Sequence, residues 1–162
     1  MKNRPPLTRA RLRELLHYDK DTGEFRWLER VGNEVRPGPV AGTVNIRVQG
    51  RHYSAHQLAH LYMTSRWGRP MIDHRDGNST NNRWTNLRLA TASQNNANRR
   101  LPGHNTSGYK GVVYCHKSRR WRGFIRYRGR VNYLGSFATP EAAHAAYVAA
   151  APKVHGKFAR TK

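Results

Sequence analysis

The basic residues of this chain are unevenly distributed, and the asymmetry divides it into two parts. The 162 residues carry 30 Lys and Arg against 9 Asp and Glu, a formal net charge of +21. Residues 99–162 hold 14 of the basic residues but a single acid, Glu141. A charge of this size attracts polyanions, of which nucleic acid is the usual one. The second part is therefore the stronger electrostatic anchor, and the acids that metal chemistry needs lie in the first.

Composition excludes several other classes of protein. Cys115 is the only cysteine, so neither an internal disulfide nor a cysteine-rich zinc site can form. No apolar run approaches the roughly 20 residues that cross a bilayer, and the first residues lead into no apolar signal core. We expect an intracellular protein that is neither secreted nor bound to a membrane. A ribosome-associated or otherwise basic protein remains an alternative at this point.

The sequence of the first part, residues 1–98, predicts helices and strands in mixed order. A helix capped by Thr8 precedes a strand at 24–28, a loop at 30–42, a hairpin at 43–54 and a helix at 55–66. The leucines at 12, 15 and 16 would share one side of the first helix. A short strand ending at His74 and a helix at 91–100 complete this part.

Residues 69–98 hold the densest group of polar side chains. Hydrolysis of a phosphodiester needs a base for the attacking water, and an imidazole serves near neutral pH. It also needs a hard cation, for which Asp and Asn oxygens are suitable ligands. Asp73, His74 and Asn95 are the right residue types. On a strand, Asp73 and His74 point to opposite sides, so one can hold a metal while the other faces the water.

The run IDHRDGNSTNNRWTNLRLATASQNN resembles the HNH, or ββα-metal, motif of phage and intron homing endonucleases. The resemblance covers residues 53–98 and implies that Asp73 and Asn95 bind one metal ion and that His74 is the general base. It implies that Asn86 fixes the loop and the imidazole, and that His56 is supporting structure. Asn95 in place of a second histidine favours Mg²⁺ or Mn²⁺ over zinc or nickel.

Other interpretations of this stretch are weaker. Asp76, Gly77 and Asn78 favour an ordinary turn whether or not the chain is a nuclease. An EF-hand is excluded because acids do not alternate before Gly77. His104, in the predicted linker at 99–107, is a bystander.

After the linker the pattern changes to three strands, at 108–114, 121–128 and 131–137, followed by an alanine-rich helix from Pro140. Thr139, Pro140 and Glu141 are typical of a helix start. Alternation places Trp121, Ile125 and Tyr127 on the face toward that helix, with Gly123 allowing a close approach. Arg122, Phe124, Arg126 and Arg128 would share the opposite face.

Four segments resemble the Apetala-two, or ethylene-response-factor, DNA-binding domain: GYKGV at 108–112, WRGFI at 121–125, LGSF at 134–137 and TPEAA at 139–143. The resemblance implies a three-stranded sheet in the major groove with a helix behind it. It assigns DNA contact to Lys110, Arg122, Arg126 and Tyr133, and alternation adds Arg128. Val113 and Cys115 stand where plant members carry arginine, so plant sequence preference is not transferred.

These observations predict an α+β protein: an HNH nuclease module at 1–98, a linker at 99–107 and a DNA-binding domain at 108–162. The predicted function is a metal-dependent endonuclease that uses one Mg²⁺ or Mn²⁺ per chain on double-stranded DNA, of the homing or phage-associated nickase kind, with no obligate protein partner. The alternative is a non-enzymatic DNA-binding regulator with a decayed nuclease module. An RNA-binding protein is less favoured, because Trp121 and Tyr127 point inward and the arginine-faced strand lacks the surface aromatics that base stacking needs.

Overall fold

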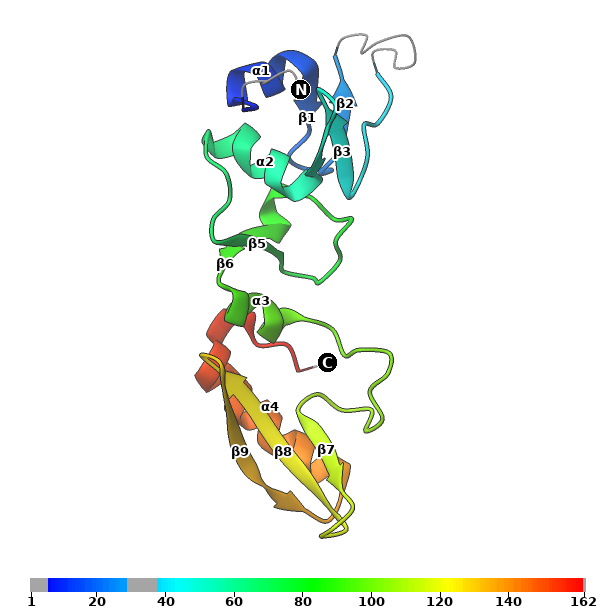
Figure 1. The fold of residues 1–162 in the computed structure, drawn as a ribbon, viewed down its shortest axis with the longest axis vertical. Helices are drawn as coiled ribbons and strands as arrows, with labels where there is room; N and C mark the ends of the chain where they lie inside the picture. The colour runs from blue at the N-terminus through cyan, green and yellow to red at the C-terminus, as the bar shows by residue number, and fades with distance from the viewer. Residues whose placement is uncertain (1–5, 29–37, 162) are drawn as a thin grey trace. The chain divides into compact units, whose positions relative to one another are not determined.

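The protein is described here from a computed structural model, which covers residues 6–28 and 38–161. It divides into two compact units, Met1–Leu89 and Ala90–Lys162 (Figure 1). Helices and small antiparallel sheets occur in both, which confirms the mixed helix-and-sheet class. In the described part of the chain, no helix is long and apolar enough to span a membrane.

The first unit consists of short elements around one apolar core. In chain order they are α1 (Arg9–Leu15), β1 (Leu16–Tyr18), β2 (Phe25–Trp27), β3 (Asn45–Val48), β4 (Arg51–Ser54), α2 (Ala55–Thr64), β5 (Met71–His74), η1 (Trp84–Asn86) and β6 (Leu87–Ala90). The strands pair as β1–β2, β3–β4 and β5–β6. The core includes Leu12, Phe25, Ile46 and Leu58, all fully buried.

Most elements of the first unit were predicted, but the start of the chain differs. Thr8 caps α1 as expected, because its Oγ1 accepts from the Arg11 amide at 3.2 Å. The helix stops at Leu15, however, and Leu16 begins β1, where it lies opposite Trp27. Leu16 is still fully buried. The apolar spacing therefore predicted correctly that Leu16 is buried, but wrongly that it belongs to the helix. Part of the predicted loop at 30–42 lies outside the described residues.

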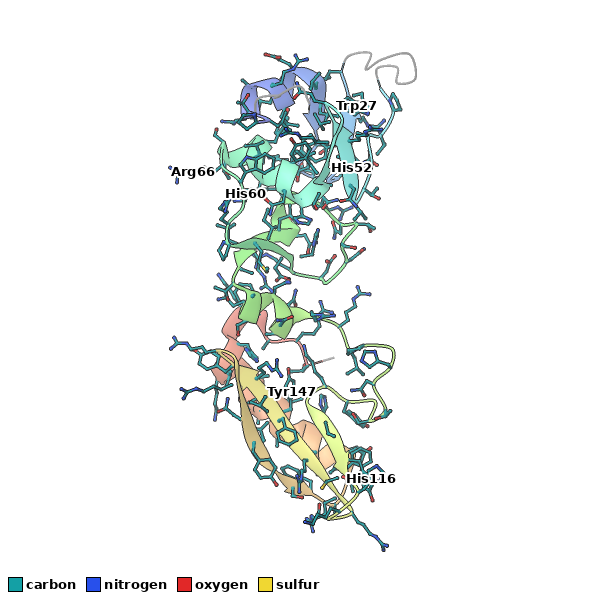
Figure 2. The ribbon with its side chains drawn as sticks, viewed as in Figure 1. Trp27, His52, His60, Arg66, His116 and Tyr147 are labelled. Atoms are coloured by element: carbon teal, nitrogen blue, oxygen red, sulfur yellow. The ribbon has the colours of Figure 1, made fainter. Side chains whose placement is uncertain are left out.

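The second unit contains α3 (Ala92–Asn98), β7 (Val112–Cys115), β8 (Arg120–Tyr127), β9 (Arg130–Phe137), α4 (Pro140–His155) and η2 (Gly156–Phe158). The strands form one antiparallel sheet in the order β7–β8–β9, and α4 packs along one face of it (Figure 1). Ile125 of β8 meets Tyr147 and Ala151 of α4 in the core; Tyr147 is labelled in Figure 2. Thr139 caps α4, accepting from the Ala142 amide at 3.2 Å.

Glycines explain two features of this sheet. The first strand begins at Val112 rather than at 108, because Gly108 and Gly111 both adopt positive φ angles that interrupt an extended strand. A side chain at Gly123 would meet the Ala143 carbonyl of α4 at 3.2 Å, so its absence allows the helix to approach, as predicted. The register shifts between Gly123 and Phe124, which marks a bulge.

The division at Leu89 falls earlier than the predicted linker at 99–107. Helix α3 belongs to the second unit because Ala90 and Ala97 share a small core with Phe158, near the end of the chain. The domain boundaries at 98 and 108 stay predictions. The contacts within the structure, however, group α3 with the C-terminal sheet.

Candidate functional site

Strand β5 carries two adjacent buried side chains, Asp73 and His74. The Asp73 Oδ2 atom lies 2.8 Å from the Arg88 Nε atom of the paired strand β6, and both side chains are almost inaccessible to solvent. A buried ion pair of this kind stabilises little by itself, but loss of one partner leaves an uncompensated charge. Asp73 is thus held in one position at the end of the strand.

The imidazole of His74 is oriented by Asn82, which is 1% exposed. The Asn82 Nδ2 atom donates to the Thr43 carbonyl, so its Oδ1 faces His74 and lies 3.1 Å from Nε2. An amide oxygen only accepts hydrogen bonds, and therefore Nε2 carries the proton. Nδ1 is then the basic nitrogen of the ring. This is the tautomer that can accept a proton from water at Nδ1.

Asn82 is in turn fixed by the β1–β2 region. The Tyr18 hydroxyl donates to the Asn82 carbonyl at 2.6 Å, and burial, reinforced by Asp19 and Asp21, raises the pKa of Tyr18 well above its usual range. The Trp84 amide donates to the Lys20 carbonyl at 2.9 Å. Gly23 lies so close to the loop that a Cβ there would come within 2.5 Å of the Arg83 nitrogen. The N-terminal elements thus support the orientation of His74.

His56, at the start of α2, packs edge-on against His74, with ring centroids 5.2 Å apart and planes at 87°. Burial, and to a smaller extent the neighbouring His74, lowers the pKa of His56 to about 4. A neutral ring at this position places no positive charge beside His74. The supporting role expected for His56 fits this geometry.

Asn86 closes the loop after β5. Its Nδ2 donates to Asp76 Oδ1 at 3.0 Å and to the Asn81 carbonyl at 2.7 Å, while its Oδ1 accepts from the Asp76 amide at 3.1 Å. Burial raises the pKa of Asp76, but hydrogen bonds from Asn78, Asn81 and Asn86 outweigh it and the net shift is downward. The expected fixing of the loop therefore has a structural basis. The imidazole contact expected of the same residue is made by Asn82, a role that the local sequence pattern did not indicate.

Asn95, the second expected metal ligand, lies half-buried on α3. The helix begins with a capping box: Thr91 Oγ1 accepts from the Gln94 amide, and the Thr91 amide donates to Gln94 Oε1. Among the described residues there is no group of three or more His, Cys, Asp or Glu arranged to hold a metal. The expected donors are one carboxylate and one amide oxygen, and this chemistry fits a hard divalent cation that keeps several waters.

Two comparisons identify the region that contains these residues. Residues 53–97 match the family model described as HNH endonuclease. Over 89 residues the chain is 37% identical to "Protein 3.8" of Escherichia phage T7, and the alignment spans 55% of this chain and 73% of that protein. The chain belongs to the family of protein 3.8 and contains an HNH endonuclease domain. No solved structure matches it. The HNH domain runs from β4 into α3 and includes His56, Asp73, His74, Asn82, Asn86 and Asn95.

Outside the HNH domain, the face of the sheet away from α4 carries arginines among apolar side chains. Arg122 lies between Val113 and Ser136 in the register, and Arg126 lies opposite Val131. Tyr133 is 58% exposed and pairs with Phe124, with ring centroids 5.6 Å apart. We call this the outer face, made up of Val113, Arg122, Phe124, Arg126, Val131 and Tyr133. The expectation that this face lacks surface aromatics was wrong.

Other residues of the predicted DNA face lie elsewhere. Arg128 is in the β8–β9 turn with a φ of 47°, and its guanidinium carbon lies 5.1 Å from the Tyr127 ring centroid. Alternation ends at the turn, which is why the assignment of Arg128 to the outer face fails. Tyr127, predicted to lie on the face toward the helix, is near His155 of α4 and is 38% exposed. Trp121 lies half-buried against Tyr114.

Lys110 also departs from its expected place. Its Nζ atom donates to the carbonyl of Arg99 at 2.8 Å and to that of Ala97, at the end of α3. Burial, with a smaller contribution from Arg160, lowers the pKa of Lys110 to about 8. The structure thus gives the ammonium group protein partners, whereas the family resemblance assigned it to DNA.

Proposed function

We propose that this protein is a metal-dependent DNA endonuclease in which the HNH domain hydrolyses a phosphodiester bond and the C-terminal sheet anchors the duplex. The observation that carries the proposal is the pair Asp73–His74 on β5 within the HNH domain, with the imidazole oriented by Asn82. A buried carboxylate next to an oriented histidine is an arrangement suited to hydrolysis.

His74 acts as the general base in this proposal. Its Nδ1 takes a proton from water as the water oxygen bonds to phosphorus, and the bond from phosphorus to the leaving 3′ oxygen breaks. The leaving oxygen is then protonated from solvent. Asn82 keeps Nε2 protonated through the step and so stabilises the imidazolium that forms. His56 stays neutral, so it adds no positive charge next to the imidazolium of His74.

Asp73 and Asn95 would hold one Mg²⁺ or Mn²⁺. Such an ion neutralises charge on the phosphate and on the leaving oxygen. Arg88 already pairs with Asp73 and orients its carboxylate. Asn86 contributes indirectly, because it holds the Asp76–Asn81 loop that follows the two site residues.

The outer face of the second unit is the proposed DNA anchor, with Arg122, Arg126 and Tyr133 as its contacts. The strongly basic composition of residues 99–162, which contain one acid, supports a polyanionic partner. Arginine can contact phosphates or the O6 and N7 atoms of guanine. The Apetala-two resemblance adds the major groove as the expected location.

The competing function is a DNA-binding regulator without activity. Its test is the conversion of supercoiled plasmid to open circle by the purified protein with Mg²⁺, with EDTA, and with the His74→Ala variant. We expect nicking only by the parent protein with Mg²⁺. Binding without nicking over a full Mg²⁺ and Mn²⁺ titration favours the regulator. Because Phe124 and Tyr133 could also stack on unpaired bases, single-stranded DNA and RNA of the same sequence should be included as competitors.

A further inference from the structure

The C-terminal end of α3 is held by a residue that precedes the sheet. Helix α3 has seven residues, so its last carbonyls need partners from outside the helix. Lys110 Nζ supplies hydrogen bonds to Ala97 and Arg99. A cation at this end also interacts favourably with the helix dipole. Without Lys110, these carbonyls would lose their charged donor.

The backbone around Lys110 is fixed to α4. The Tyr109 hydroxyl donates to Glu141 Oε1 at 3.1 Å, and His144 Nδ1 donates to the Lys110 carbonyl at 3.2 Å. Gly111 lies so close to α4 that a Cβ would come within 2.4 Å of the Tyr147 ring. Lys110 is therefore presented from a rigid position, and its side chain reaches the end of α3.

The end of the chain supports α3 a second time. Phe158 is buried against Ala90 and Ala97, and Arg160 Nε donates to Asn98 Oδ1 at 3.4 Å. The short helix is thus held by two segments of the C-terminal unit. It also carries Asn95, which the proposed function assigns to the metal.

We propose that Lys110 is a positioning residue of the nuclease, which fixes α3 and with it Asn95, and is not a DNA contact. Residues outside the HNH domain then do more than bind DNA, because Lys110 and the end of the chain hold a helix of that domain in place. This inference rests on the proposed function for the role of Asn95, but the anchoring of α3 can be tested without cleavage.

The experiment compares Lys110→Met with Lys117→Met in the full-length protein. Methionine keeps the length of the side chain and removes the ammonium group. Lys117 is an exposed lysine in the β7–β8 turn of the same unit and serves as the matched control. Three quantities are measured for each: hydrogen exchange of the α3 amides, DNA affinity at two salt concentrations, and the single-turnover cleavage rate at saturating enzyme with Mg²⁺. Lys110→Arg, which can still donate to both carbonyls, is the conservative variant.

We expect Lys110→Met to accelerate exchange in α3 and to slow saturated cleavage by up to about 10- to 100-fold, the range seen when residues that orient a metal ligand are lost. Its affinity and salt slope should equal those of Lys117→Met, and Lys110→Arg should restore most of the rate. The proposal is overturned if α3 exchange is unchanged, or if Lys110→Met weakens binding and lowers the salt slope by about one unit beyond the control. If the parent protein does not cleave DNA, the proposed function fails. The hydrogen exchange of α3 and the DNA affinity still decide the role of Lys110 in that case.

Discussion

The two units use polar residues in opposite ways. In the first unit, Asp73, His74, Asn82 and Asn86 are buried and bonded to other protein groups. In the second, Arg126, Val131 and Tyr133 of the outer face are exposed on a regular sheet. No buried side-chain nitrogen or oxygen in the described parts of the chain lacks a hydrogen-bond partner. A catalytic group must be held in a fixed direction, whereas a group that binds a polyanion needs only to bring charge within reach. Substitutions of the buried polar residues and of the outer face should therefore differ in kind.

Replacing Asp73 should give the largest effect. We expect Asp73→Asn to slow metal-dependent cleavage by roughly 100-fold or more, because a carboxylate brings a full charge to a hard cation and an amide brings only a dipole. Asn95→Ala should cost less. Asparagine is chosen at 73 because it can still accept from Arg88, whereas alanine would remove the carboxylate that balances a buried guanidinium, at about 3–5 kcal/mol. Calorimetric Mg²⁺ titration of DNA-bound protein in a His74→Ala background provides the measurement.

Equal Mg²⁺ affinity in the parent, Asp73→Asn and Asn95→Ala backgrounds would remove both residues from the metal site. Circular dichroism of each variant must first show an unchanged fold, so that a lost ion pair is not mistaken for a lost ligand.

Gly23→Ala tests the support of the site by the N-terminal elements. Gly23 has a φ of +81°, and a Cβ would lie 2.5 Å from the backbone of Asn82 and Arg83. We expect a loss of roughly 2–4 kcal/mol in unfolding free energy, from left-handed strain and crowding together. Gly129→Ala is the control, since its φ is +79° and nothing lies within 4 Å of the added carbon. That variant should lose only about 1–2 kcal/mol. Equal losses in urea denaturation would contradict the close approach.

Lowering the pH should destabilise the first unit, because His56 is protonated more readily in the unfolded chain. Its pKa in the folded protein is about 4, against an ordinary value of 6.5, so the unfolded chain binds a proton that the folded protein does not. The free energy of unfolding should therefore fall as the pH is lowered from 6.5 to 4. His56→Gln should reduce this slope, while His104→Gln, at an exposed position, should not. Denaturation at pH 7.0, 5.5 and 4.5 checks the slope, and an NMR titration of His56 with a midpoint near 6.5 would refute it.

The smallest predicted effect concerns the apolar part of the outer face. Val113 and Val131 are 57% and 55% exposed beside the arginines. If this face enters the major groove, they can contact thymine methyl groups. Replacing thymine by deoxyuridine in a preferred site should weaken binding by up to about 0.8 kcal/mol per methyl lost. The Val113→Ala variant should show a smaller thymine preference. A preference that is unchanged in that variant would place Val113 away from the bases.

Local patterns predicted much of this structure, and the failures have physical causes. Strand β5, helix α2 and the start of α4 follow from alternation, apolar spacing and capping residues, which act within a few positions. Asn82 could not be found this way, because its partners Thr43 and Tyr18 are 39 and 64 residues away. The partners of Lys110 could not be found this way either, because its long side chain can reach a helix or a phosphate from one backbone position. Arg128 was misassigned because alternation ends where the turn begins.

The division between a cutting site in the HNH domain and an anchoring outer face is tested most directly by a crossed comparison of His74→Ala with Arg126→Ala. For both variants and the parent, the DNA dissociation constant at two salt concentrations and the single-turnover rate at saturating enzyme are measured. We expect His74→Ala to lose roughly 100- to 10,000-fold in rate at unchanged affinity. Arg126→Ala should lose affinity, with a salt slope smaller by about one unit if it contacts a phosphate, and should keep the parental rate. If Arg126→Ala slows the saturated reaction as much as His74→Ala does, or if His74→Ala cuts at the parental rate, the division is wrong.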